Sequence, residues 1–166
     1  MKLRLILLRH AKSGWDDPGL SDHDRPLTDR GMRDAENVGA WLTKNGFVPG
    51  FVLSSTATRA AETCRIVADQ LEPHPRIEFT PKLYHASPDT ALDLLGSVDA
   101  DTVMLVGHNP TMSILAELLS GENGAHSFGH YPTAAAVVFE FSASAWKDIQ
   151  FGRGKPKAFV RPRDLR

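Results

Sequence analysis

Cysteine is almost absent from this sequence, in which Cys64 stands alone among 166 residues. One cysteine excludes a disulfide framework and a multi-cysteine zinc or iron–sulfur site. The histidine and carboxylate spacings typical of metal sites are also missing, so we expect neither a metal nor a cofactor. A Walker loop and a dinucleotide-binding GxGxxG segment are absent too, which excludes ATP-driven kinases and dehydrogenases.

Long hydrophobic runs and an excess of either charge are missing as well. The apolar run near the N-terminus covers only residues 5–8, far short of the roughly 18 residues of a membrane span. With 19 basic and 20 acidic side chains the net charge is −1, so no overall basic field would attract nucleic acid. The basic residues gathered over 151–166 are interpreted as a solvated segment. We therefore expect a cytoplasmic protein with no nucleic-acid or membrane partner.

What the sequence does have is the length and composition of one globular domain. Its 166 residues are close to the usual size of a domain, and 42% hydrophobic with 23% charged residues argue against a disordered chain. No internal repeat, low-complexity tract or linker divides it. We predict a single domain over residues 1–166.

Short apolar runs alternate with helical patterns along the chain. The runs predict strands at residues 2–8, 51–53, 77–79, 102–106 and 134–141, with 158–160 as a candidate sixth. Helical spacing predicts helices over 28–45, 57–71, 88–95 and 110–119. Thr28 is expected to cap the first helix, and Ser54, Ser55 or Thr56 the second. This order predicts an α/β fold, a three-layer α/β/α sandwich around a mostly parallel sheet.

Polar clusters follow three of the predicted strands at the point where each strand ends. They are residues 9–10 (Arg-His), residues 55–59 (which end in Arg59) and residues 107–109 (Gly-His-Asn). In open α/β sheets, ligands bind beside the carboxyl ends of strands and near helix N-termini. Two arginines, two histidines and two helix N-termini would then share one pocket. That set suits a phosphoryl group, because guanidinium forks and free N–H groups bind its oxygens.

A histidine in such a pocket has two alternative roles. It can donate a hydrogen bond to phosphate, or a ring nitrogen can attack phosphorus and form a phosphohistidine. Attack requires one neutral ring nitrogen and a fixed orientation through the other. For His10, a backbone carbonyl just after it in the chain could hold the second nitrogen, and the surrounding cations would lower the pKa of the ring.

Four spaced motifs resemble those of the histidine phosphatase superfamily, also called phosphoglycerate-mutase-like. They are LRHAKS (8–13), RPLTDRG (25–31), SSTATRAAET (54–63) and VGHNP (106–110). The short chain without a large insertion is similar to the SixA-type phosphohistidine phosphatases. The resemblance implies a phosphoglycerate-mutase-like fold, with His10 as nucleophile. It also implies that the phosphoryl oxygens are bound by Arg9, Arg25, Arg59 and His108. As an alternative, Arg25 is a loop arginine that pairs with Asp22 or Asp24.

The sequence departs from the family pattern at two places. Ala11 replaces the glycine of the RHG signature, which is tolerable if the φ angle of this residue is negative. Relatives that act on phosphate esters carry a carboxylic acid as proton donor, and LYHASPDT (83–90) offers no clear match for it. His85 and Asp89 are the nearest candidates, followed by Asp16 and Asp17 in the first loop.

The missing acid bears on the choice of substrate. A positioned general acid accelerates departure of an alkoxide by about 10²–10⁴-fold, whereas imidazole leaves readily with a proton from solvent. We therefore predict a metal-independent phosphatase that acts through a phosphohistidine intermediate, on phosphohistidine in a signalling protein. The alternatives are a phosphatase of small phosphate esters that uses Asp89 or His85 as acid, and a catalytically silent phosphate-binding or interaction module.

The remaining polar and aromatic residues are expected to have structural roles. Cys64 is predicted to be a small core residue. The tryptophans Trp15, Trp41 and Trp146 are interpreted as packing residues, although Trp15 in the first loop could alternatively touch substrate. The histidines expected to be exposed rather than ligating are His23, His74, His126 and His130.

Overall fold

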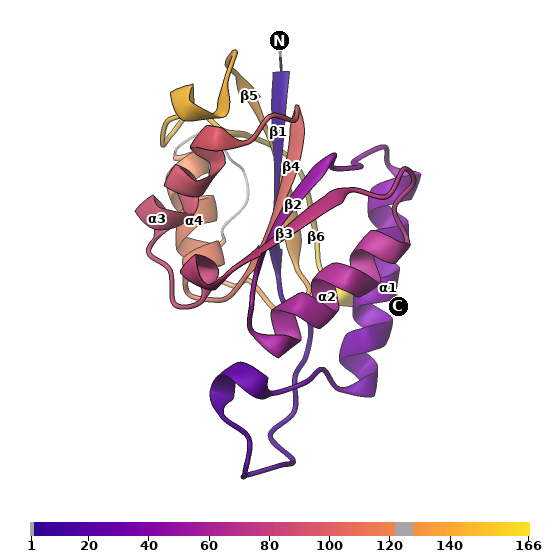
Figure 1. Ribbon diagram of the computed structural model, residues 1–166. Helices are drawn as coiled ribbons and strands as arrows, with labels where there is room; N and C mark the ends of the chain where they lie inside the picture. Colours follow the sequence, from indigo (N-terminus) through magenta and orange to yellow (C-terminus); the bar gives the residue numbers. More distant parts are fainter. Residues whose placement is uncertain (1, 122–127) are drawn as a thin grey trace.

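A six-stranded sheet forms the centre of the computed structural model, which describes residues 2–121 and 128–166 (Figure 1). The strand order is β3-β2-β4-β1-β5-β6. Four strands are parallel to one another: β1 (Lys2–Arg9), β2 (Phe51–Ser55), β3 (Arg76–Thr80) and β4 (Thr102–Gly107). The other two run antiparallel to their neighbours: β5 (Ala136–Ser142) to β1 and β6 (Lys155–Val160) to β5.

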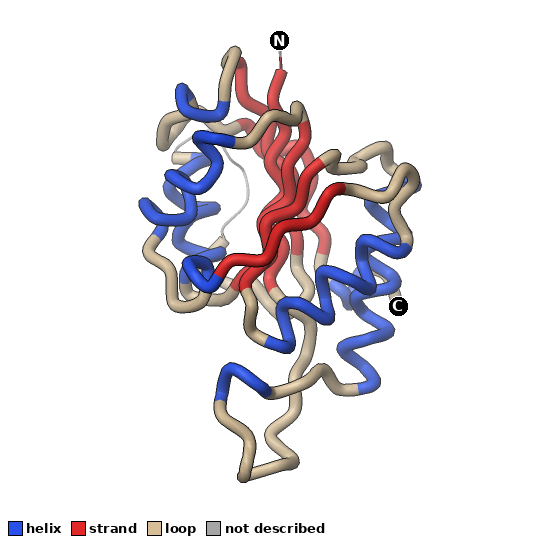
Figure 2. The backbone as a smooth tube through the Cα atoms, in the orientation of Figure 1, coloured by secondary structure: helices blue, strands red, loops and turns tan. Residues whose placement is uncertain are grey.

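Helices cover both faces of this sheet, as Figure 2 shows. One face carries α1 (Asp29–Lys44) and α2 (Thr58–Asp69), and the other carries α3 (Pro88–Asp93) and α4 (Thr111–Ser120). The predicted α/β/α sandwich around a mostly parallel sheet is confirmed. The candidate sixth strand is also confirmed, as part of β6.

The two layers follow from the alternation of side chains along the buried strands. In β1, Leu3, Leu5 and Leu7 pack into the cluster that includes α3 and α4, whereas Ile6 and Leu8 pack toward α1 and α2. All five side chains are buried. Each such burial contributes roughly 1.5–3 kcal/mol to folding, so β1 is fixed between the layers and its carboxyl end is a rigid base for a site.

The register of the sheet brings the three polar clusters to one edge. Arg9 at the end of β1 pairs with Gly107 of β4, and Ser54 of β2 pairs with Val106 of β4. The chain just before β5 closes the same edge, because the Ala134 N–H donates to the carbonyl oxygens of Arg9 and His10 at 3.1 and 3.0 Å. The expected convergence of these strand ends is therefore confirmed.

The first helix is anchored to the loop that follows β1. Thr28 Oγ1 accepts from the Gly31 N–H at 3.0 Å, which confirms the predicted cap, and the Thr28 N–H donates to the Lys12 carbonyl at 2.9 Å. Gly31 allows this close approach, because a Cβ there would lie 2.2 Å from the Lys12 carbonyl oxygen. The glycine of RPLTDRG thus holds the start of α1 against the loop beside His10.

The predicted cap of the second helix is wrong. The N-cap of α2 is Ala57, whose methyl side chain cannot accept a hydrogen bond from the helix. Ser55 lies two residues before the cap, and its Oγ accepts from the N–H of Ala57 itself at 3.2 Å. The Ser55 hydroxyl therefore remains close to the end of β2, where it is also hydrogen-bonded to His108.

Candidate active site

A hollow of about 310 Å³ opens at the carboxyl edge of the parallel strands. Its lining includes six residues that the sequence predicted for catalysis or phosphate binding: Arg9, His10, Arg25, Arg59, His85 and His108. A larger open hollow, of about 780 Å³, lies at the opposite end of β1 and is lined by Lys2 and Glu140 among others. Those two side chains already form an ion pair with each other at 3.4 Å. The smaller hollow, which gathers the predicted residues, is therefore the candidate active site.

The orientation of the His10 ring is fixed by a hydrogen bond from one of its two nitrogens. Its Nδ1 lies 2.7 Å from the Ala11 carbonyl oxygen, and since a carbonyl only accepts, Nδ1 carries the proton and Nε2 has the lone pair. The predicted backbone carbonyl is therefore confirmed. Burial lowers the pKa of His10 to about 3, and the nearby His108, Arg59 and Arg9 add smaller lowering effects. The predicted direction is confirmed, but burial rather than the cations is the main cause.

Ala11 fits the position of the family's glycine. Its φ is not in the left-handed region, which the described non-glycine residues enter only at His85 and Ala134. Its side chain is fully buried, and its N–H donates to Thr63 Oγ1 at 2.9 Å. The extra methyl group is thus accommodated by the backbone that orients His10.

His108 faces His10 across the hollow. The ring centroids are 5.2 Å apart with the planes at 54°, and His108 Nε2 lies 2.8 Å from Ser55 Oγ. Burial first, and then the charge of Arg59, lowers the pKa of His108 to about 4. Both histidines are therefore neutral near pH 7, and each has a ring nitrogen free of any partner among the described residues.

Three buried side-chain nitrogens in the site lack a hydrogen-bond partner. Among the described residues, the buried side-chain nitrogen and oxygen atoms without a partner are Arg9 Nε, Arg59 Nε and His108 Nδ1. All three belong to residues that line the hollow. An unpaired buried polar group costs about 1–3 kcal/mol. Burial and the charge of Arg59 also lower the pKa of Arg9, so a group with several anionic oxygens would relieve both costs at once.

Asp22 orients two arginines, of which only Arg25 was considered as its partner from the sequence. Its Oδ1 accepts from Arg25 Nε at 3.1 Å, and its Oδ2 accepts from Arg59 at 3.1 Å and from the Tyr84 hydroxyl at 2.5 Å. The hydrogen bonds from Tyr84 and Arg59 hold the pKa of Asp22 well below its usual value. An ionised Asp22 thus fixes two guanidinium groups at the edge of the hollow. The role of Tyr84 was not predicted from the sequence.

Arg25 has the predicted pairing with Asp22, and its contact with phosphate stays a prediction. It pairs with Asp22, and it also lines the hollow with only 8% of its surface exposed. Its second contact is a donation from Nη1 to Ser13 Oγ at 2.8 Å. The ion pair with Asp22 therefore holds Arg25 at the hollow and does not draw its side chain away from it.

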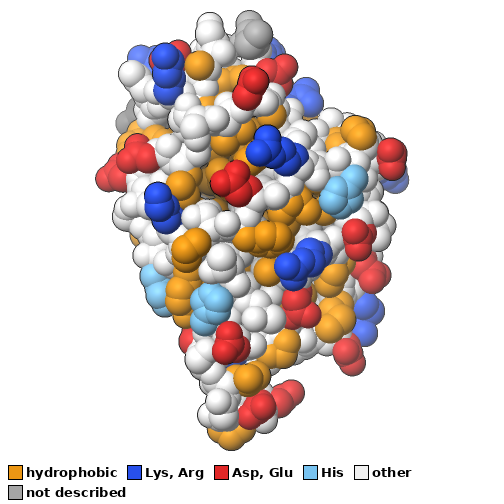
Figure 3. Space-filling model, viewed as in Figure 1, with side chains coloured by type: hydrophobic (Ala, Val, Ile, Leu, Met, Phe, Trp, Pro, Cys, Tyr) orange, Lys and Arg blue, Asp and Glu red, His pale blue; other side chains and the backbone are white. Residues whose placement is uncertain are grey.

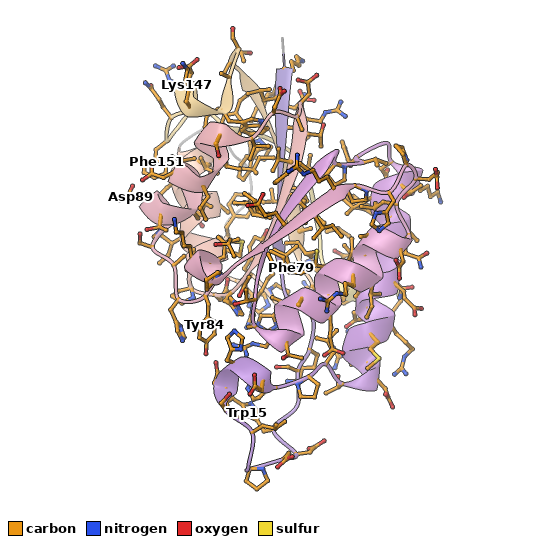
Figure 4. All side chains as sticks on the ribbon, viewed as in Figure 1. Trp15, Phe79, Tyr84, Asp89, Lys147 and Phe151 are labelled. Carbon is orange, nitrogen blue, oxygen red and sulfur yellow. The ribbon has the colours of Figure 1, made fainter. Side chains whose placement is uncertain are left out.

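Of the two main proton-donor candidates, the structure places His85 at the hollow and Asp89 outside it. His85 lines the hollow, is exposed, and has a φ of 58°, whereas Asp89 is exposed on the outer side of α3 (Figure 4). Ser87 caps that helix by accepting from the Thr90 N–H at 3.1 Å, which places Asp89 in its first turn and outside the hollow. Asp89 is therefore not brought to the site, and Asp16 and Asp17 lie outside its lining as well.

The other histidines lie away from the reacting groups. His23 is half-buried with Nε2 3.0 Å from Thr56 Oγ1, so its predicted exposure is wrong. His74 and His130 are exposed as predicted. The prediction for His126 lies outside the described residues.

Cys64 and two of the tryptophans have the predicted structural roles. Cys64 is buried, and burial raises the pKa of its thiol to about 11. Trp146 is buried, and Trp41 packs against Phe47 with ring centroids 5.7 Å apart. Trp15 is different, because 74% of its surface is exposed. Trp15 is therefore not packed like the other two, and the alternative that it touches substrate stays a prediction.

Residues 2–121 and 128–166 contain neither a candidate metal site nor a candidate membrane span. No group of three or more His, Cys, Asp or Glu side chains could hold a metal ion there. No helix of that part of the chain is long and apolar enough to cross a membrane. The metal-free mechanism and the cytoplasmic location stay predictions.

The lowered pKa values predict that the protein loses stability in mild acid. An unfolded histidine titrates near 6.5, so below that pH the unfolded chain binds more protons than the native state, and the free energy of unfolding falls. With folded values of about 3 for His10 and about 4 for His108, each histidine removes about 2 kcal/mol between pH 7.5 and pH 5. Urea unfolding in phosphate-free buffer at the two pH values measures the loss. His10→Gln should reduce it by about half, whereas an equal loss in this variant would contradict the assignment.

Comparison with known proteins identifies the family. Residues 5–86 match the sequence model of the histidine phosphatase superfamily (branch 1). An uncharacterized protein of Mycobacterium tuberculosis is 35% identical over 164 residues, which cover 94% of this chain and the whole of the relative. The putative phosphohistidine phosphatase SixA from Agrobacterium tumefaciens has a TM-score of 0.83 at 31% identity, over 96% of this chain and 98% of that one.

The chain belongs to the histidine phosphatase superfamily. The predicted family and its SixA type are confirmed. A putative alpha-ribazole-5'-P phosphatase from Escherichia coli shares the fold with a TM-score of 0.68 at 18% identity, over 96% of this histidine phosphatase and 97% of that chain. Membership therefore assigns phosphatase chemistry to the site, and the choice of substrate has to come from the pocket itself.

Proposed function

We propose that this histidine phosphatase hydrolyses phosphohistidine in proteins, through a phosphohistidine intermediate on His10. One observation carries the proposal. A neutral histidine with a free Nε2 stands among unpartnered nitrogen donors, in a hollow whose described lining contains no carboxylate. Such a site binds and transfers a phosphoryl group, but it has no carboxylic acid to protonate an alkoxide.

In the first step, the lone pair of His10 Nε2 attacks phosphorus. The Nε2–P bond forms as the bond from phosphorus to the substrate imidazole breaks, and the electron pair of that bond stays on the leaving ring nitrogen, which takes a proton from water. The His10 ring becomes cationic, and its Nδ1–H remains bonded to the Ala11 carbonyl. Arg9, Arg59 and His108 donate to the equatorial oxygens through the three unpartnered nitrogens.

In the second step, water attacks phosphorus from the side that the leaving group vacated. The P–Nε2 bond breaks and its electron pair returns to Nε2, while the proton of the water passes to phosphate or solvent. Inorganic phosphate leaves, and His10 is restored with its proton on Nδ1. Asp22 takes no proton in either step, because Tyr84, Arg25 and Arg59 keep it ionised.

A substrate comparison tests this proposal. The protein is incubated with histidine-phosphorylated proteins and, in parallel, with a panel of sugar and other metabolite phosphates. We expect kcat/KM to be at least about 100-fold higher on phosphohistidine, the lower limit of what a positioned acid contributes to ester cleavage. Equal or faster hydrolysis of an alkyl phosphate would contradict the proposal.

One observation favours hydrolysis of small phosphate esters instead, namely that His85 lines the hollow. His85→Gln separates the two functions. We expect phosphohistidine turnover to change less than about threefold, and any alkyl phosphate turnover to fall by about 10²-fold. Asp89→Asn is the matched control and should change neither rate, since Asp89 lies outside the hollow. If His85→Gln loses both activities equally, His85 acts as the acid for both substrates. Hydrolysis of small phosphate esters would then be favoured over hydrolysis of phosphohistidine as the function.

A further inference from the structure

Trp15 is an unusual surface residue. It borders the active-site hollow with 74% of its surface exposed, on the loop that projects from the sheet edge (Figure 4). Its ring nevertheless has a fixed support, because the guanidinium carbon of Arg25 lies 3.5 Å from the ring centroid. Arg25 is in turn held by Asp22 and Ser13. The tryptophan is therefore presented to solvent from a rigid base, which lowers the entropic cost of binding through it.

A second hollow continues the same surface on the other side of Arg25. It has a volume of about 500 Å³, and Leu20, Pro26 and Leu27 contribute apolar surface to it. Leu20 is 40% exposed. Since Arg25 lines both hollows, the surface from Trp15 to Leu20 is continuous with the active site. Figure 3 shows hydrophobic and acidic side chains gathered at this tip of the molecule.

The edge of the second hollow is acidic. Asp16, Asp17 and Asp29 line it, and Asp17 Oδ1 accepts only a local bond from the Gly19 N–H. The two arginines of the lining are paired within the chain, Arg25 with Asp22 at 3.1 Å and Arg30 with Asp34 at 3.7 Å. The carboxylates at this edge therefore attract a positive charge from outside.

We infer that Trp15 and the second hollow form a docking surface for the polypeptide that carries the phosphohistidine. This inference rests on the proposed function. His10 is only 6% exposed in a hollow of about 310 Å³, so a phosphorylated side chain enters while the rest of its protein stays outside, against Trp15. The partner has an apolar residue and a basic residue next to its phosphohistidine, which complement the Leu20 surface and the Asp16 carboxylate.

The first test compares free phosphohistidine with two phosphohistidine peptides. One peptide has leucine and arginine beside the modified residue, and the other has serine and glutamate. Trp15→Ala should lower the ratio of kcat/KM on the leucine–arginine peptide to that on free phosphohistidine by about 10-fold or more, as loss of an interface tryptophan does. Trp15→Phe should keep most of the ratio. Phe151→Ala removes a control side chain that is 38% exposed and distant from Trp15, and should leave the ratio unchanged.

The second test reverses one charge. Asp16→Lys should lower kcat/KM on the leucine–arginine peptide about threefold to tenfold, and raise it on the serine–glutamate peptide, relative to free phosphohistidine. Asp24→Lys is the matched control, because Asp24 is an exposed carboxylate of the same loop that lines neither hollow.

The outcomes separate the docking surface from the proposed function. Equal losses on peptide and free phosphohistidine would overturn the docking surface, because Trp15 would then act only through Arg25. Unchanged ratios in Trp15→Ala and Asp16→Lys would also overturn it and leave the proposed function intact. A wild-type protein that hydrolyses none of the phosphohistidine substrates would contradict the proposed function itself, and the docking inference with it.

Discussion

Replacing His10 with alanine is expected to lower phosphohistidine turnover by at least about 10⁴-fold, because the variant has no atom that can accept the phosphoryl group. The fold should survive. His10 stands at the end of β1, where its one side-chain hydrogen bond goes to the adjacent Ala11 carbonyl, and the hydrophobic clusters on both sheet faces do not include it. Steady-state kinetics with far-ultraviolet circular dichroism measure both effects.

His74→Ala is the control for removal of a histidine. His74 is exposed and its Nε2 lies 4.0 Å from Asp69 Oδ1, away from the hollow, so its loss should leave turnover unchanged. A His10→Ala protein that is folded and keeps more than about a tenth of wild-type activity would show that phosphoryl transfer does not pass through His10.

Arg59 should give the second largest effect. Arg59→Ala is expected to lower kcat/KM by about 10³-fold and Arg59→Lys by about 10²-fold. The guanidinium donates from Nη1 and Nη2 to the backbone oxygen and carboxylate of Asp22, at 2.7 and 3.1 Å, while Nε has no partner among the described residues. We expect Nε to donate to the phosphoryl group. A lysine has one nitrogen and cannot satisfy Asp22 and a phosphoryl oxygen in this geometry.

Arg65→Ala provides the matched control on the same helix. Arg65 is exposed and lies over the Phe79 ring at 4.9 Å, on the surface rather than in the hollow. Its removal should leave kcat/KM within about twofold. If Arg59→Lys were as active as the wild-type protein, a fork-shaped donor would not be needed and Arg59 would not bind the phosphoryl group.

Much of the fold and the placement of the site could be predicted from the sequence. The apolar run at 102–106 is buried on both sides in β4, and the polar residues directly after β1, β2 and β4 meet because parallel strands end at one edge. The role of a backbone carbonyl beside His10 was also predictable, since the Ala11 carbonyl is adjacent in the chain. These features depend on local sequence and on one rule of topology.

Other features depend on tertiary contacts that leave no local pattern. The hydrogen bonds that Asp22 accepts from Arg59 and Tyr84 join residues 37 and 62 positions apart. From the sequence, only the neighbouring Arg25 could be considered as a partner of Asp22. Trp15 was interpreted as a packing residue, but 74% of its surface is exposed, and the Arg25 guanidinium lies over its ring. Asp89 was a candidate because it is a titratable residue of LYHASPDT (83–90), where the acid was sought, yet the cap at Ser87 starts α3 and places Asp89 in the first turn, outside the hollow.

Trapping of the intermediate tests the central claim most directly. The protein is mixed with a histidine-phosphorylated protein labelled with ³²P, quenched in base within the first turnover, digested and mapped. We predict an acid-labile, base-stable label on His10, attached at Nε2 because Nδ1 is bonded to the Ala11 carbonyl. A label on Ser13 or on Cys64, or phosphate release with no labelled protein at any time, would contradict the account.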